Sequence, residues 1–144
     1  ITRQPGVTVQ GPGRLKSAGV VDMNRLPDGV MTLAVLAALA QGETRIVNVA
    51  NLRIKESNRL AALVAELQRI GIEAEELADG IRIQGGEPHG ADIETYADHR
   101  MAMSFAILGA RVPGIRIGTP ECVSKSYPTF FEELQVLLRS HRRG

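Results

Sequence analysis

Residues 27–71 read PDGVMTLAVLAALAQGETRIVNVANLRIKESNRLAALVAELQRIG, and helix-like and strand-like patterns alternate along them. A run that is apolar nearly all round predicts a buried helix, opened by a proline and closed by a glycine. A β-branched run then predicts a strand, and apolar residues at i, i+3, i+4 and i+7 predict an amphipathic helix. These three elements are expected at residues 28–41, 44–49 and 56–70.

The flanking sequence continues this alternation in both directions, so we predict an α+β fold. Asp79-Gly80 lies between two short β-prone runs and is a strong hairpin signal. Asp98 is expected to cap a further helix, and Pro128 is expected to open the last one. The remaining strands are expected at residues 6–10, 72–77, 81–84 and 114–118, and the remaining helices at residues 98–109 and 128–139.

An internal repeat is indicated by matching residues 70 positions apart in the sequence. The pairs are Asp28 and Asp98, Met31 and Met101, and Lys55 and Lys125. In both copies a small-residue helix leads to a glycine, a strand with an Arg-Ile step, a lysine-bearing loop and an amphipathic helix. We therefore predict a duplicated module at approximately residues 28–84 and 98–139, whose second copy stops before the hairpin.

Composition excludes several classes of protein. The 144 residues are 44% hydrophobic and 23% charged, which suits one domain's worth of folded chain. Only 3% are aromatic and the net charge is +1, so neither a base-stacking platform nor a general field for nucleic acid or membrane is expected. No apolar stretch reaches the roughly 18 residues of a membrane-spanning helix. We therefore expect no nucleic-acid or membrane partner.

The cysteine count and the N-terminal sequence bear on location and completeness. Cys122 is the single cysteine, so no internal disulfide can form, and a reducing, cytoplasmic location is expected. The first residues lack the apolar centre of a signal peptide. They also lack an initiator methionine, so we expect the chain to be a piece of a longer protein.

Polar side chains gather in four short segments at or just before predicted helix N-termini. The segments are Pro27-Asp28, residues 51–59 (NLRIKESNR), Asp98-His99-Arg100 and Ser124-Lys125-Ser126. Free backbone N–H groups and the helix dipole favour anions at such ends. Four of the side chains are cations: Lys55, Arg59, Arg100 and Lys125. If the repeat brings equivalent ends together, the expected ligand carries two or more phosphate or carboxylate groups.

Each of these residues also has a purely structural interpretation, and spacing alone leaves both open. The structural alternatives are N-caps at Asp28 and Asp98, a solvated first helical turn with Lys55, Glu56 and Arg59, a surface pair of His99 with Arg100, and an ordinary loop around Lys125.

Three stretches of the sequence resemble the C-terminal third of the EPSP synthase (3-phosphoshikimate 1-carboxyvinyltransferase) family. They are VDMNRLPDGVMTLAVLAALAQGETRIVNVANLRIKESNRLAALVAELQRIGIEAEE at residues 21–76, ADIETYADHRMAMSFAILG at 91–109 and CVSKSYPTFFEEL at 122–134. The resemblance implies the enolpyruvyl transferase fold, built of six βαβαββ units in two domains. By this likeness residues 1–144 form a single partial C-terminal domain with about two of the six units.

The resemblance also implies a reaction. The 5-hydroxyl of shikimate 3-phosphate adds to C2 of phosphoenolpyruvate, C3 is protonated, and the intermediate loses phosphate. No metal or organic cofactor is required. The implied partners are the two substrates and the remainder of the EPSP synthase chain.

Family roles carry over onto matching positions of this sequence. Asp28 resembles the base at the shikimate hydroxyls, Glu56 the proton-transfer carboxylate, and Lys125 a group that shares in proton transfer. The implied ligands of shikimate 3-phosphate are Asp28, Asn51 and Lys55; those of phosphoenolpyruvate are Arg59, Arg100 and Lys125; His99 is implied to support Glu56. Asn58 stands where many family members carry Asp and receives no catalytic role.

Two other functions remain open at this point. The sister family that acts on UDP-N-acetylglucosamine shares the fold but lacks this combination of motifs. The chain is also short enough to be a non-catalytic phosphate-binding or interaction fragment. If the chain instead carries about half of an EPSP synthase active site, we expect the chain alone to be inactive and to bind substrate weakly.

Overall fold

A computed structural model describes residue 6, residue 10 and residues 13–141 of the chain. The strand predicted at residues 6–10 lies largely outside these residues. The first described strand is β1 (Gly19–Asp22), which the sequence did not predict. It was missed because its residues are mostly exposed and show no alternation of apolar and polar side chains.

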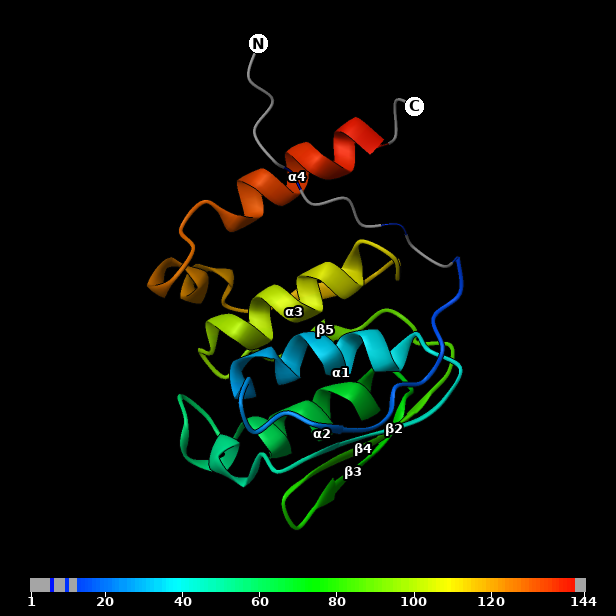
Figure 1. The fold of residues 1–144 in the computed structure, drawn as a ribbon. Helices are drawn as coiled ribbons and strands as arrows, with labels where there is room; N and C mark the ends of the chain where they lie inside the picture. The colour runs from blue at the N-terminus through cyan, green and yellow to red at the C-terminus, as the bar shows by residue number, and fades with distance from the viewer. Residues whose placement is uncertain (1–5, 7–9, 11–12, 142–144) are drawn as a thin grey trace.

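A four-stranded sheet and two helices form the first part of the fold (Figure 1). The elements after β1 are α1 (Val30–Ala38), β2 (Gly42–Val47), α2 (Arg59–Arg69), β3 (Glu73–Leu77) and β4 (Gly80–Gly85). The strand order is β1-β2-β4-β3; β1 is parallel to β2, and β4 is antiparallel to both its neighbours. This is the order βαβαββ along the chain.

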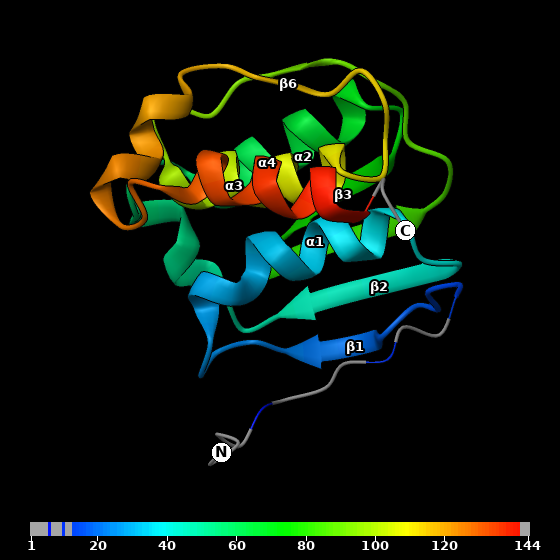
Figure 2. The same cartoon turned by 90° about the horizontal axis from the view of Figure 1, so that it is seen from above.

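A second, shorter run of elements follows. It consists of β5 (Asp92–Ile93), α3 (His99–Gly109), β6 (Arg116–Ile117) and α4 (Phe130–His141). β5 and β6 form a separate parallel pair. α3 lies beside α1, and α4 lies beyond α3, as the two views show (Figures 1 and 2).

One face of the four-stranded sheet is apolar and the other is charged. Ile46, Ile81 and Ile83 are fully buried beneath the helices. On the opposite face Arg82 pairs with three glutamates of the neighbouring strands, at 2.8–3.3 Å. Apolar and charged side chains therefore alternate along the strands, so that one face of the sheet packs on the core and the other faces solvent.

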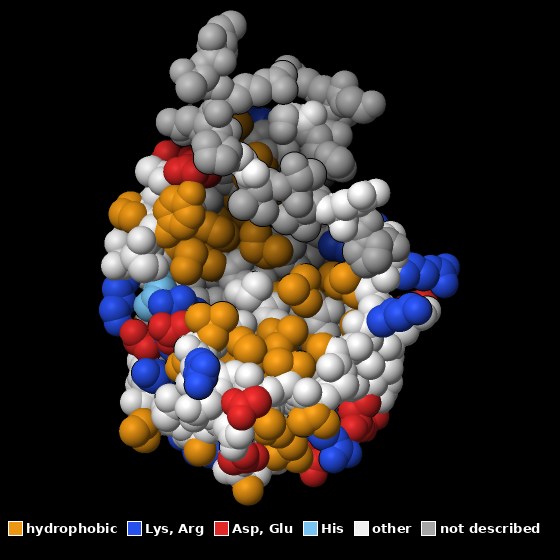
Figure 3. Space-filling view, viewed as in Figure 1, with side chains coloured by type: hydrophobic (Ala, Val, Ile, Leu, Met, Phe, Trp, Pro, Cys, Tyr) orange, Lys and Arg blue, Asp and Glu red, His pale blue; other side chains and the backbone are white. Residues whose placement is uncertain are grey.

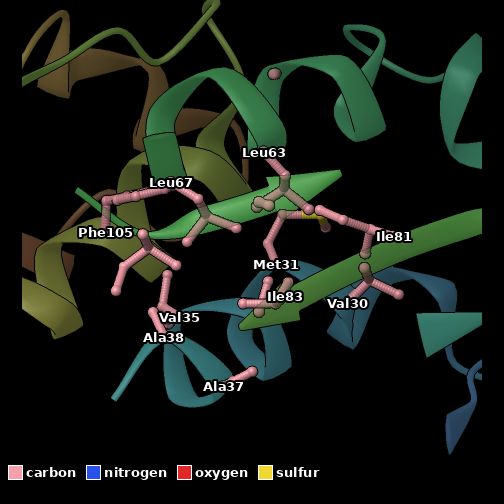
Figure 4. Close-up of a cluster of buried hydrophobic side chains, with 14 of the residues drawn as sticks. Val30, Met31, Val35, Ala37, Ala38, Leu63, Leu67, Ile81, Ile83 and Phe105 are labelled. Carbon is pink, nitrogen blue, oxygen red and sulfur yellow. The ribbon is translucent and has the colours of Figure 1, made fainter. Parts of the chain in front are cut away.

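The core lies where α1, α2 and α3 meet the sheet. Met31, Leu63, Ile83 and Phe105 are all fully buried in it (Figure 4). The core is aliphatic apart from Phe105, as the composition predicts. Exposed apolar side chains remain outside it on α1, α3 and α4; they include Leu36, Ile107, Val136 and Leu137. No helix in residues 13–141 is both long enough and apolar enough to cross a membrane.

Several predicted boundaries shift in the structure. The helix predicted at 56–70 begins at Arg59, because the Asn58 side chain accepts the amide N–H of Ala61 and caps it there. The helix predicted from residue 28 is preceded by the 3₁₀ turn η1 (Pro27–Gly29). Two further 3₁₀ turns were not predicted: η2 (Ala50–Ile54) and η3 (Pro120–Lys125).

The predicted hairpin is present, one residue earlier than expected. Leu77 pairs with Gly80, so Ala78 and Asp79 form its two-residue turn. Gly80 belongs to the strand itself. A Cβ there would lie 1.9 Å from the carbonyl oxygen of Ile46, so only glycine allows the strands this approach.

Candidate active site

Arg59 is the centre of the candidate site. It is the first residue of α2, and its side chain is 1% exposed. Its Nε donates to Oδ2 of Asp98 at 2.6 Å, and one Nη donates to Oδ1 of Asp28 at 3.0 Å. The other Nη donates to Oε2 of Glu56 at 2.8 Å and to Oδ1 of Asp98 at 3.2 Å. Three carboxylates therefore surround one buried guanidinium.

Two more cations extend this arrangement toward solvent. Arg100 forms an ion pair with Asp28, with an Nη atom 2.9 Å from Oδ2, and Lys125 donates to Oε1 of Glu56 at 2.7 Å. Charges thus alternate in a line that we call the charge chain: Arg100, Asp28, Arg59, Glu56 and Lys125. Asp98 lies behind its centre, fully buried. The left edge of Figure 3 shows basic and acidic side chains interleaved over the N-terminal ends of α1 and α3.

Each member of the charge chain is placed by a helix start or a turn. Asp28 lies in η1 just ahead of α1, and Arg100 lies in the first turn of α3. Glu56 follows η2, and Lys125 ends η3. The lysines that the repeat paired, Lys55 and Lys125, thus both stand at the end of a 3₁₀ turn.

Opposite charges within the site neutralise one another and shift the pKa values of its carboxyl groups. Its three cations and three carboxylates balance, as a buried guanidinium requires. The hydrogen bond from Lys125 lowers the pKa of Glu56 from 4.5 to about 2, with its own backbone amide and Arg59 contributing in the same direction. Burial opposes ionisation of Asp98, but hydrogen bonds from Arg59 and the Arg100 amide outweigh it and lower its pKa. Both groups are carboxylates at neutral pH.

His99 lies beside the charge chain but forms no side-chain hydrogen bond to Glu56 among the described residues. It is nearly buried, and within the described part of the chain its Nδ1 has no partner. Burial lowers its pKa below the usual value, which favours a neutral ring at pH 7. The surface-pair alternative for this histidine is therefore wrong.

Two predicted site residues remain outside the charge chain. Asn51 lies in η2 and Lys55 directly follows it; both are exposed. Neither side chain makes a hydrogen bond or ion pair within residues 13–141.

The structure also decides two of the structural alternatives. Neither η1 nor α1 receives a side-chain cap, so Asp28 is not an N-cap. Asp98 does cap α3, because it accepts the Arg100 amide at 2.9 Å, yet it binds Arg59 as well. A solvated helical turn does not describe Arg59, which is buried.

Two polar partners of the site were not foreseen. Asp98 was predicted only as a cap, although its match with Asp28 across the repeat was a signal that both would face the same group. Ser57 donates to Oδ2 of Asp98 at 3.3 Å, and nothing in the sequence singled it out.

A hollow of about 210 Å³ opens beside the charge chain. Asp28 and Arg100 line one side, and Phe130 at the start of α4 lines another. Thr32 of α1 and Ser104 of α3 meet in its wall with their hydroxyl oxygens 3.4 Å apart. The site thus offers exposed cations for an anion, carboxylates that can accept hydroxyl protons, and hydroxyl groups nearby.

Comparison with known proteins identifies relatives of this chain. The family model described as EPSP synthase (3-phosphoshikimate 1-carboxyvinyltransferase) matches residues 1–134. A 3-phosphoshikimate 1-carboxyvinyltransferase of Syntrophobacter fumaroxidans is 46% identical over 136 residues, 93% of this chain and 32% of the relative. One from Mannheimia succiniciproducens is 47% identical over 120 residues, 81% of this chain and 28% of the relative.

A solved structure has a similar backbone. The EPSP synthase of Acinetobacter baumannii superposes with a TM-score of 0.74 at 36% identity, covering 83% of this chain and 29% of that one. The chain therefore spans about 30% of the length of the relatives it matches. The matched residues include every member of the charge chain. The protein chain therefore belongs to the EPSP synthase family of enzymes.

Proposed function

We propose that the chain carries about half of an active site that transfers the enolpyruvyl group of phosphoenolpyruvate to the 5-hydroxyl of shikimate 3-phosphate. Family membership and the charge chain support this proposal. The observation that carries it is the pairing of two solvent-accessible cations of the charge chain with carboxylates suited to proton transfer: Arg100 with Asp28, and Lys125 with Glu56. The reaction needs both kinds of group, because two phosphates and a carboxylate must be held while protons move.

The proposed proton movements divide between the two carboxylates. Asp28 accepts the proton of the 5-hydroxyl as its oxygen bonds to C2 of phosphoenolpyruvate. Glu56 is ionised, so the proton comes from the Lys125 ammonium: it passes along their 2.7 Å hydrogen bond to Glu56 and from that carboxyl group to C3. The C2–O bond to phosphate then breaks, and the departing phosphate takes the proton that Asp28 had accepted. A proton of C3 returns to the Glu56–Lys125 pair as the double bond forms again. No metal or organic cofactor enters this scheme.

The cations differ in how they reach a ligand. Lys125 is exposed and Arg100 is half-buried; within the described residues each pairs with one carboxylate, so a phosphate or carboxylate group can bind beside them. Arg59 is enclosed by its three carboxylates. It contacts phosphoenolpyruvate only when Asp28 or Glu56 turns toward substrate. Asn51 and Lys55 hold the 3-phosphate from the segment before α2. His99 supports Glu56 electrostatically, without a direct hydrogen bond.

We also propose how the chain is organised into repeat units. The run from β1 to β4 forms one βαβαββ unit, and the run from β5 to α4 forms most of a second, related by duplication. The remaining units belong to the rest of the EPSP synthase chain, which supplies the opposite wall of the site. The single cysteine is consistent with a cytoplasmic location.

Complementation tests the reaction. The chain is co-expressed with the N-terminal portion of a family enzyme, and phosphate release from phosphoenolpyruvate and shikimate 3-phosphate is measured. We expect turnover from the pair and none from either part. Absence of turnover from a pair that forms a stable complex would contradict the proposal.

A non-catalytic phosphate-binding fragment is the second candidate, because the chain spans only about 30% of its relatives. Isothermal titration of the chain with shikimate 3-phosphate, with and without phosphoenolpyruvate, separates the two. Tight binding by the chain alone would favour a self-sufficient binding module. Weak binding that tightens with the N-terminal portion would favour a half-site, because closure over substrate completes such sites.

A further inference from the structure

The segment that connects β5 to the capping residue of α3 has an unusual backbone. Tyr96 and Ala97 have φ angles of 55° and 53°, two successive non-glycine residues in the left-handed region. L-residues with side chains rarely adopt this conformation, and two in succession are kept only where surrounding contacts fix them. The next residue is Asp98, which binds Arg59 at the centre of the site.

Both ends of this segment are held by one face of α2. Arg59 holds Asp98 at the far end, with hydrogen bonds of 2.6 and 3.2 Å. At the near end Glu66 accepts the amide N–H of Glu94 at 3.1 Å and the hydroxyl of Tyr96 at 3.0 Å. Arg59 and Glu66 are seven residues apart, two helical turns, and therefore point to the same side of α2.

Glu66 is fully buried, although it belongs to no part of the charge chain. Within the described part of the chain its cationic partner is Arg69, half exposed on the same helix, at 2.9 Å. A buried carboxylate costs free energy, and a well-packed apolar residue usually stabilises a fold at least as well. Its two bonds to the left-handed segment therefore point to a positional role.

We propose that Glu66 is a positioning residue of the active site. It anchors Glu94 and Tyr96, so that the left-handed turn ends with Asp98 aimed at Arg59. Arg59, held in that orientation, in turn aligns Asp28 and Glu56. This role depends on the proposed function only in calling the aligned residues catalytic; the anchoring itself is a property of the fold.

Hydrogen exchange measured by NMR on the ¹⁵N-labelled chain tests the anchoring. The reporters are the Nε–H of Arg59 and the amide of Arg100, both of which donate to Asp98. The reference signals are the amides of Ile81 and Ile83 in β4. Glu66→Ala removes the anchor, Tyr96→Phe removes one of its two bonds, and Arg69→Gln is the matched control that leaves both bonds in place.

In Glu66→Ala we expect both reporters to exchange at least about tenfold faster, the factor that one lost buried hydrogen bond supplies. We expect the exchange rates of the reporters to rise about threefold or more in Tyr96→Phe and to stay unchanged in Arg69→Gln. The exchange rates of Ile81 and Ile83 should remain constant in all three variants. If Glu66→Ala does not fold, Tyr96→Phe carries the same measurement.

Reporter exchange within twofold of native in folded Tyr96→Phe would overturn the proposal. So would an equal rise at the reporters and in β4, since Glu66 would then only stabilise the fold. Neither substrate nor turnover enters the experiment, so an error in the proposed reaction could not produce either result.

Discussion

Arg59 illustrates how a residue's chemistry depends on groups that are distant in the sequence. Its place near a predicted helix N-terminus indicated a cation for an anionic ligand, whereas the folded chain surrounds it with three carboxylates. Asp28 and Asp98 lie 31 and 39 residues away from it, one before and one after. The sequence predicts that these polar residues gather; it does not predict which will pair, because pairing depends on how α1, α2 and α3 pack.

Replacing Glu56 by Gln tests the proton-transfer role at the scale of one atom. The amide keeps the size of the side chain but cannot carry a proton, so we expect kcat of the complemented enzyme to fall at least about 100-fold. Glu87→Gln is the control, because Glu87 forms no ion pair within the described residues and lies outside the charge chain. Phosphate release measures the turnover of both variants, and near-native turnover of Glu56→Gln would contradict the proton-transfer role of Glu56.

The low pKa of Glu56 also predicts a pH dependence of stability. Folding holds its pKa at about 2, below the ordinary 4.5, so the ionised group stabilises the folded state fully above pH 4.5. That contribution is lost as pH falls from 4.5 to 2, because the unfolded chain then binds the proton more readily. Urea unfolding of the native chain and Glu56→Gln should show their difference shrinking over this range. A constant difference between pH 2 and 7 would contradict the Lys125–Glu56 pair.

At the scale of elements, the start of α2 decides where the site lies. Asn58 ends the loop that carries Glu56 and caps the helix that begins with Arg59. Without that cap, the helix could extend toward residue 56, where apolar periodicity alone had placed its start. Capping depends on the side-chain geometry of one residue, so boundaries are harder to predict than the presence of a helix.

Asn58→Ala should therefore destabilise the chain by about 1 kcal/mol, the usual cost of a lost N-cap. Asn58→Asp is the matched variant: it retains a capping oxygen, and its charge suits a helix N-terminus, so its stability should remain within about 0.5 kcal/mol of native. Urea denaturation followed by circular dichroism measures both. Equal stability of all three proteins would show that the cap contributes nothing.

Secondary structure was predicted best where a long apolar pattern determines it. The helices appear as α1 to α4, and the hairpin appears within one residue of its predicted place. β1 and β5 were missed because they are short and carry little apolar pattern; β5 has only two residues. Their positions depend on pairing with β2 and β6 rather than on their own residues.

At the scale of the whole molecule, the charge chain joins the two runs of elements. Asp28, Glu56 and Arg59 come from the run that ends with β4, whereas Asp98, Arg100 and Lys125 come from the run that begins with β5. The contact between α1 and α3 provides the apolar part of the same junction. A site built in this way forms only when both runs are packed together, which couples catalytic geometry to folding.

That coupling can be measured with a double-mutant cycle on Arg59 and Asp98. Arg59→Met leaves a buried carboxylate unpaired, so it should cost about 3–5 kcal/mol in unfolding free energy. Asp98→Asn should also destabilise, but in Arg59→Met it should cost much less, because the unpaired charge is already the dominant penalty. The difference, obtained from urea unfolding, should reach at least about 2 kcal/mol.

The same cycle on Arg116 and Asp92 is the matched control, because it also contains an Arg–Asp pair but joins exposed side chains of β6 and β5. An exposed pair is expected to give a coupling of about 0–1 kcal/mol. A large coupling for the buried pair and a small one for the exposed pair would show that Arg59 and Asp98 hold the two runs together. If the changes in unfolding free energy at Arg59 and Asp98 were additive, the apolar packing between α1 and α3 would hold the two runs together, and the charge chain would contribute nothing to that contact.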